Sequence, residues 1–189
     1  MDATAMETTI GVAFPWLNMT LDCTDDLAKL IPEDLLDWRH DDPSGKWCFS
    51  LGEIAMHCSD ARIMFARQLS GNDSHEGYFS EGPGEDGVWK FKAHGGKQAI
   101  LDCLAASRKE IEPFMQMPVS AMGEITEGSQ SAFDKHLAAM KENDQDTAEV
   151  EARGPANIVR VLMAIAVHEA GHRGSLQTLL RQKGINFGE

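Results

Sequence analysis

The sequence predicts an all-α fold, a single four-helix bundle over residues 1–189, and three observations support this. Apolar residues recur every three or four positions in four long segments, as they do on one face of a helix. Period-two alternation rich in Val, Ile and Thr, which is typical of strands, is absent from the sequence. With 189 residues the chain is long enough for one ordinary core and short for two. Four amphipathic helices in one domain pack as a four-helix bundle.

Each of the four helices is expected from local signals. The first spans 16–31 and ends at a proline, which cannot continue a helix. The second runs over 50–70 and opens on Ser50-Leu-Gly-Glu53, a capping-box sequence. The third spans 97–115. The last runs over 155–183, with proline at its start and glycine just past its end, the usual asymmetry of helix termini.

Two long connections interrupt the bundle. Residues 71–96 follow the second helix, are rich in Gly, Asp and Glu and show no helical period, so we expect a long loop that acts as a lid. Its aromatic residues, among them Trp89 and Phe91, are able to pack over another part of the molecule. Residues 116–153 form a polar insertion between the third and fourth helices, with one short helix expected near 129–141.

Composition excludes several classes of function. The formal net charge of -13 repels polyphosphates and no basic stripe offsets it, so the sequence predicts no nucleic-acid partner. The chain has no apolar run of membrane-spanning length and begins with a polar, acidic segment, so neither a membrane partner nor a secretory signal is expected. Four scattered cysteines without a Cys-x-x-Cys pair predict reduced thiols in a cytoplasmic protein.

The last helix carries the strongest functional signal, in the run Val167-His168-Glu169-Ala-Gly-His172. At about 100° per residue, all three titratable groups fall on the apolar arc of this helix. Burying them without partners costs several kcal/mol each, by general estimates of about 2–7 kcal/mol, so they need partners inside the protein. Histidines at i and i+4 present their ring nitrogens to one point, the spacing that a metal ion on a helix requires.

A metal site with two histidines needs a further ligand, because catalytic zinc normally takes three protein ligands and keeps a position for water. His57 is the best candidate, since it lies in the middle of the second helix among apolar neighbours. Glu53, one turn earlier, is explained by the capping box, although it is also placed to accept a hydrogen bond or serve as a fourth ligand. Asp60, one turn later, is expected to be solvated, and Cys58 is expected to pack sideways.

Two other interpretations of the last helix compete with a three-histidine site. His168 and His172 are also compatible with core histidines that are satisfied by hydrogen bonds. In addition, His168-Glu-x-x-His172 matches the short signature of zinc peptidases, in which the Glu activates water. The chain departs from the metzincin continuation of that signature at Ser175 and Thr178, and it lacks the strand edge that aligns a peptide.

The whole arrangement resembles the DinB/YfiT-like superfamily of metal-binding four-helix bundles, and three stretches carry the resemblance. The first is Trp38 followed by Ser50-Leu-Gly-Glu53 and His57, the second is His168-Glu-Ala-Gly-His172-Arg-Gly, and the third is Leu-Arg-Gln-Lys-Gly-Ile at 180–185. Residues 71–153 match only in being helical and polar. Gly171 and Ser175 stand where the family often has a polar residue and Gln.

The resemblance implies that His57, His168 and His172 bind a divalent metal ion, zinc or nickel, with water completing the coordination. Some relatives transfer low-molecular-weight thiols such as bacillithiol, or use mycothiol to isomerise maleylpyruvate. By this resemblance, we expect a metal-dependent S-transferase that activates a low-molecular-weight thiol co-substrate for attack on a small electrophile.

Two alternatives to the thiol transferase stay open. One is a metal-dependent hydrolase in which Glu169 is the catalytic base, and the other is a non-catalytic metal-binding stress-response bundle. As a structural residue, Glu169 would instead orient a ligand histidine or pair with a buried cation. The expected partner is a small-molecule substrate. Bundles that expose apolar helix faces often pair by two-fold symmetry, so a homodimer is a further expectation.

Overall fold

The computed structural model describes residues 7–41, 43, 48–85 and 88–187, and most of these residues lie in helices, which confirms the all-α class. The elements in chain order are α1 (Ile10–Ala13), α2 (Pro15–Leu30), η1 (Glu33–Leu35), α3 (Leu51–Ser70), β1 (Ser80–Pro83), β2 (Trp89–Phe91), α4 (Lys97–Met115), η2 (Val119–Gly123), α5 (Glu127–Glu142), α6 (Ala148–Arg153) and α7 (Ile158–Gln182). The helices predicted at 16–31, 50–70, 97–115 and 155–183 correspond to α2, α3, α4 and α7.

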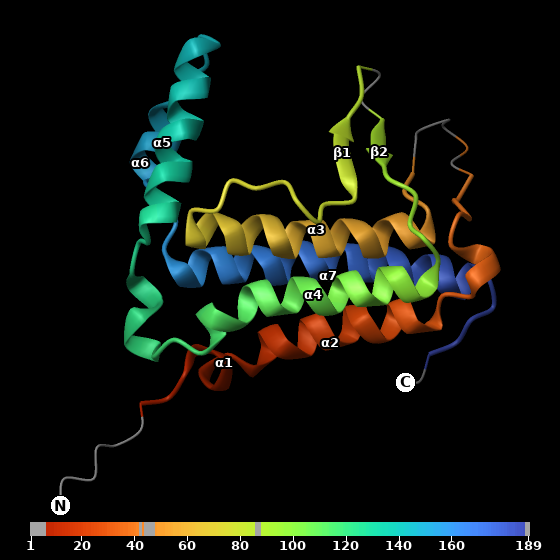
Figure 1. Cartoon of the computed structure of the whole chain (residues 1–189). Coiled ribbons are helices and arrows are strands. Elements are labelled where there is room, and N and C mark those ends of the chain that lie inside the picture. Colours follow the sequence, from red (N-terminus) through yellow and green to blue (C-terminus); the bar gives the residue numbers. More distant parts are fainter. Residues whose placement is uncertain (1–6, 42, 44–47, 86–87, 188–189) are drawn as a thin grey trace, which may run out of the picture.

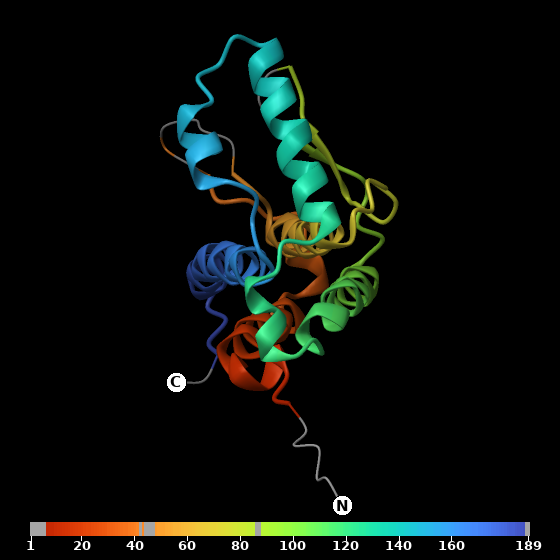
Figure 2. The same cartoon turned by 90° about the vertical axis from the view of Figure 1, so that its left-hand side faces the viewer.

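The four long helices lie alongside one another (Figures 1 and 2). Helix α3 packs against α4 and α7, and α2 packs against α7 and α4. Helices α5 and α6 form an arm that projects from these helices, and the β1–β2 hairpin projects from the same side (Figure 1). The two helices that carry the predicted site, α3 and α7, are therefore direct neighbours.

Side-chain caps set the starts of α3 and α7. The Ser50 hydroxyl accepts a hydrogen bond from the Glu53 N–H at 3.2 Å, and the Glu53 carboxylate accepts one from the Ser50 N–H at 2.8 Å. This is the predicted capping box, and it satisfies two backbone donors that the helix leaves open. Helix α7 begins at Ile158 and is capped by Asn157, whose side chain accepts the Arg160 N–H at 3.0 Å.

The core consists of two apolar clusters with a polar layer between them. One cluster joins Leu17 and Leu21 of α2 to the second half of α3 and the first half of α7; the other joins the first half of α3 to the second half of α7. Between the clusters every long helix contributes fully buried polar residues: Thr24 of α2, Ser59 and Arg62 of α3, Ser107 of α4 and Glu169 of α7. The sequence pattern had shown only Glu169 of this layer.

The hairpin corrects the prediction that the chain has no strands. Residues 71–96 are not a structureless loop, because β1 pairs with β2 antiparallel, with an irregularity in register between Ser80 and Gly82. The prediction was wrong because strands of three or four residues are too short to show a period of two, and β1 contains glycine and proline, which strands disfavour. Paired strands give this segment a defined position over α3.

The polar insertion contains more helix than the sequence predicted. The expected helix at 129–141 is α5, which is slightly longer, and the second helix, α6, was not expected. The Thr126 side chain accepts the Ser129 N–H at 3.0 Å and so starts α5 earlier than expected. Across the described ranges, no helix has both the length and the apolar character that a bilayer-spanning segment needs.

Candidate metal centre

The structure brings His57 of α3 together with His168 and His172 of α7. One ring nitrogen from each residue lies within 4.8 Å of those of the other two. The ring centroids are 4.9 Å apart for His57 and His168, 4.7 Å for His57 and His172, and 4.5 Å for His168 and His172. The Nε2 atoms of His57 and His168 face each other at 3.1 Å. The three residues predicted as ligands thus form one cluster, which we call the histidine triad.

Aromatic side chains from outside the two helices surround the triad. Phe49, just before α3, stacks on His57 with a centroid distance of 5.0 Å and meets the His172 ring edge-on at 6.0 Å. Trp89 of the hairpin lies edge-on to His57 at 5.3 Å. These rings fix the imidazoles by packing and keep much of their surface from water.

The His172 side of the triad opens into a cavity of about 860 Å³. Its walls are apolar at Phe49, Ile54 and Leu179, and α7 contributes small side chains at Ser175 and Thr178. A cavity of this size accommodates a small organic molecule. The triad is therefore open to a cavity at His172, whereas Trp89 of the hairpin packs on His57.

Burial keeps the triad neutral at physiological pH. Desolvation, with a contribution from the two neighbouring histidines, lowers the pKa of His57 to about 4. Desolvation and the His168 ring likewise lower the pKa of His172 to about 4, and burial lowers the pKa of His168. Neutral imidazole is the form that binds a metal ion.

The donor atoms fit a divalent cation. Zinc binds histidine nitrogens at about 2.0–2.1 Å, so two nitrogens in a tetrahedral site lie about 3.3 Å apart. The Nε2 atoms of His57 and His168 are close to this spacing at 3.1 Å, and a ring nitrogen of His172 lies within 4.8 Å of both ligand atoms. As core histidines they are incompletely satisfied, because the buried Nδ1 atoms of His57 and His168 have no hydrogen-bond partner among the described residues.

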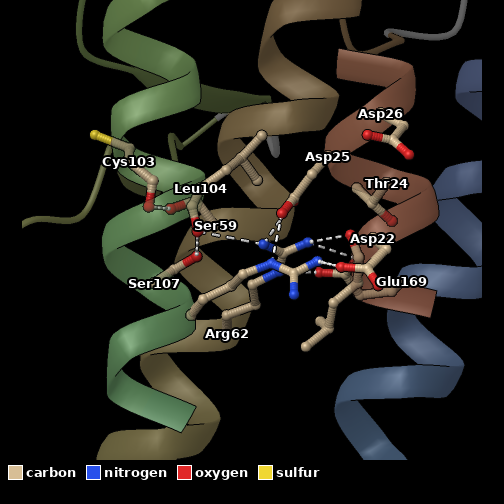
Figure 3. Close-up of polar contacts among 12 residues, drawn as sticks. Asp22, Thr24, Asp25, Asp26, Ser59, Arg62, Cys103, Leu104, Ser107 and Glu169 are labelled. Atoms are coloured by element: carbon tan, nitrogen blue, oxygen red, sulfur yellow. Dashed lines mark hydrogen bonds and ion pairs between the residues drawn. The ribbon is translucent and has the colours of Figure 1, made fainter. Parts of the chain in front are cut away.

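Glu169 lies beside the triad, but its carboxylate is directed at Arg62 (Figure 3). The Arg62 Nε donates to Oε1 at 2.5 Å and Nη2 donates to Oε2 at 3.0 Å, and both side chains are fully buried. Of the roles considered for Glu169, pairing with a buried cation is the one that this geometry matches. A general base must reach the reacting water, whereas the Glu169 carboxylate is fully buried and held by Arg62.

The residues that flank His57 on α3 have structural contacts. Glu53 completes the capping box and forms an ion pair with Arg39. Cys58 is fully buried in the apolar core, as predicted. The prediction that Asp60 is solvated was wrong: it is 5% exposed, and its two oxygens accept the N–H groups of Phe79 and Ser80 at 2.8 and 2.6 Å.

Sequence reasoning missed three residues of this region: Phe49, Arg62 and Asp60. Asp60 anchors the hairpin that carries Trp89, and Trp89 packs against His57, which lies one turn before Asp60 on α3. Its neighbours Ser59 and Arg62 are polar, so the local sequence gave no sign that Asp60 is buried. Trp38 packs on the core, and the Lys183 ammonium lies 3.9 Å from the centroid of its ring.

The fold and the triad define an all-α protein with three imidazoles gathered between two neighbouring helices. Comparisons of the chain with protein-family models, with curated proteins and with solved structures found no match.

The lowered pKa values of His57 and His172 predict that acid destabilises the metal-free protein. In the unfolded chain both imidazoles titrate at about 6.5, so between that pH and about 4 the unfolded state binds more protons than the folded state. Stability should therefore fall as the pH is lowered through this range. The measurement is Tm of the chelator-treated protein at pH 7 and pH 5. A His57→Gln/His172→Gln variant should show a flatter dependence, and equal slopes would contradict the prediction.

Proposed function

We propose that the protein is a DinB-like four-helix bundle, formed by α2, α3, α4 and α7, that binds a divalent metal ion through the histidine triad. The observation that carries this proposal is the convergence of His57, His168 and His172 beside an open cavity. We further propose that it is a transferase, with zinc or nickel as cofactor and a low-molecular-weight thiol as co-substrate. The thiol part is supported by the resemblance to the DinB/YfiT-like superfamily.

The residues around the triad suit this chemistry. A divalent cation held by the triad would supply Lewis acidity, which favours the deprotonated, nucleophilic form of a thiol near pH 7. The neutral imidazoles of the triad add no charge of their own, so the cation keeps its full electrostatic effect. Phe49 and Trp89 exclude water on one side, and the cavity beside His172 leaves space for thiol and electrophile.

The contacts of Glu169 favour the transferase over the hydrolase alternative. A hydrolase needs Glu169 to take a proton from water, but its carboxylate is fully buried and accepts two hydrogen bonds from Arg62. Turning one oxygen toward water would leave part of a buried guanidinium without a partner, which costs free energy.

We also propose a reducing, cytoplasmic location, which is supported by the absence of disulfides at Cys58 and Cys103.

Metal analysis of the native protein and of His57→Ala tests the proposal. We expect near-stoichiometric zinc or nickel in the native protein and a loss of metal affinity of a hundredfold or more, on the order of 3 kcal/mol, in His57→Ala, because a two-histidine site lacks a ligand. His136→Ala, on α5 outside the triad, is the matched control and should keep its metal. A native protein that takes up neither metal would contradict the proposal.

A spectroscopic titration separates the transferase from a non-catalytic metal-binding bundle. The probe is 2-mercaptoethanol added to Co²⁺-loaded native protein. Thiolate coordination gives a charge-transfer band in the near ultraviolet, and we expect this band in the native protein and not in His57→Ala. A cobalt-loaded protein whose spectrum does not change with thiol would favour a metal ion that only joins the helices.

A further inference from the structure

We propose that the Arg62–Glu169 ion pair positions the metal ligands, by fixing α7 against α3 so that His168 and His172 meet His57. The inference rests on the proposed metal site and assigns Arg62 and Glu169 as positioning residues. Neither residue needs to touch the metal or the substrate.

Arg62 contacts all the long helices. Beyond its two hydrogen bonds to Glu169 of α7, its Nη1 lies 2.8 Å from an Asp25 carboxylate oxygen of α2. Its Nη groups also donate to the backbone carbonyls of Leu21 on α2 and Leu104 on α4, each at 3.4 Å (Figure 3). Burial lowers the pKa of Arg62, but the hydrogen bonds and charges of Glu169 and Asp25 outweigh it, so the pKa is raised and the guanidinium stays charged.

The pair specifies one alignment of α7. A planar guanidinium that binds a carboxylate through two parallel hydrogen bonds fixes orientation as well as distance. Apolar packing in the two clusters on either side of the polar layer is non-directional, so it does not set the alignment of α7 as strictly. A shift of α7 by one residue would move its side chains by about 1.5 Å and 100°, which would separate the charges inside the core. Arg62 therefore keeps its hydrogen bonds and ion pairs in only one alignment of α7 against α3.

The alignment of Glu169 determines where the ligands lie. Glu169 follows His168 directly and precedes His172 by three residues, so a helix that fixes one of them fixes all three. On α3, Arg62 lies five residues after His57, and the same rigid helix carries both. The ion pair and the triad are two contacts between the same two helices, and the ion pair is complete without a metal.

The imidazoles lack the hydrogen bonds that usually orient metal ligands. A ligating histidine normally donates its second ring N–H to a carboxylate or carbonyl, and this sets the ring orientation. Here the buried Nδ1 atoms of His57 and His168 have no such partner among the residues that the structure describes. Their rings are held by aromatic packing, and their separation is set by the helices. The Arg62–Glu169 pair supplies the ordering that outer hydrogen bonds supply elsewhere.

Cobalt binding to two conservative variants tests this inference. Arg62→Lys keeps the charge but loses the planar fork, and Glu169→Gln keeps the shape but loses the charge. Ile111→Ala is the control, because it opens a cavity in the core on α4 and Ile111 belongs to an apolar cluster, not to the Arg62–Glu169 ion pair. Each folded protein is titrated with Co²⁺ against a chelator, at a temperature well below its Tm, and its visible absorption spectrum is recorded.

We expect both charge-pair variants to bind Co²⁺ about 10–100-fold more weakly, with an altered spectrum, which is the range seen when residues behind metal ligands are replaced. Ile111→Ala should keep the native spectrum and affinity despite its lower Tm. Native affinity and spectrum in folded Arg62→Lys and Glu169→Gln would overturn the inference. Native protein and Ile111→Ala that both fail to bind Co²⁺ or Zn²⁺ would instead overturn the metal site itself.

A double variant keeps the test decisive if neither single variant folds. Arg62→Met/Glu169→Leu replaces both buried charges with apolar groups, which proteins often tolerate. The inference expects this folded protein to bind Co²⁺ weakly, because its helices pack well but have lost the contact that aligns the ligands. Native Co²⁺ affinity in the folded double variant would overturn it.

Discussion

Replacing Arg62 with methionine is expected to lower the free energy of unfolding by about 3–5 kcal/mol, because the substitution leaves one partner of a buried ion pair uncompensated. Glu169 is fully buried, and Arg62 binds both of its oxygens. Asp25 loses less, since it keeps a second ion pair with Arg108 at 2.5 Å. The measurement is urea denaturation of the native and variant proteins followed by circular dichroism.

An exposed ion pair provides the control for this prediction. Arg153 pairs with Glu149 one turn earlier on α6, and both side chains are largely exposed. Removing an exposed pair of this kind changes stability by at most about 0.5 kcal/mol, so Arg153→Met should denature near the native midpoint. Equal losses in Arg62→Met and Arg153→Met would show that the burial of Arg62 is unimportant.

The sequence predicted the parts of the site that depend on local pattern. Two histidines four residues apart on an apolar arc must lie on one face of α7, and His57 differed from the other histidines by its apolar neighbours along α3. The helix boundaries were predicted to within a few residues from the capping sequence at Ser50 and from the proline and glycine residues at helix ends. Each of these inferences uses residues within a few turns of one another, where helix geometry leaves little freedom.

Arg62 and the hairpin were beyond sequence reasoning because their contacts are distant along the chain. The Glu169 partner of Arg62 is 107 residues away, and an arginine is normally exposed unless a carboxylate meets it inside. The sequence predicted that a buried Glu169 needs a partner, but it did not identify Arg62 as the cation that pairs with it. In the same way, Asp60 is buried only because the hairpin backbone, about 20 residues later, donates two hydrogen bonds to it.

The arm of α5 and α6 depends on a close backbone contact, and Gly128→Ala tests it. Gly128, in the first turn of α5, packs against the C-terminal end of α3. A Cβ at this position would lie 2.3 Å from the Gly71 nitrogen, 2.6 Å from the Gln68 carbonyl oxygen and 2.7 Å from that of Leu69. All three atoms belong to the backbone, so no side-chain rotation relieves the overlap, and α5 must move away from α3.

The sign of the Gly128→Ala effect is what makes it informative. Alanine in place of glycine within a helix ordinarily stabilises it by up to about 1 kcal/mol. At Gly128 we expect the opposite, a loss of about 1–3 kcal/mol from overpacking. Gly174→Ala on α7 is the matched control, because a Cβ there meets no atom within 4 Å and should raise the urea midpoint. A Gly128→Ala protein as stable as Gly174→Ala would show that α5 does not rest on α3 at this contact.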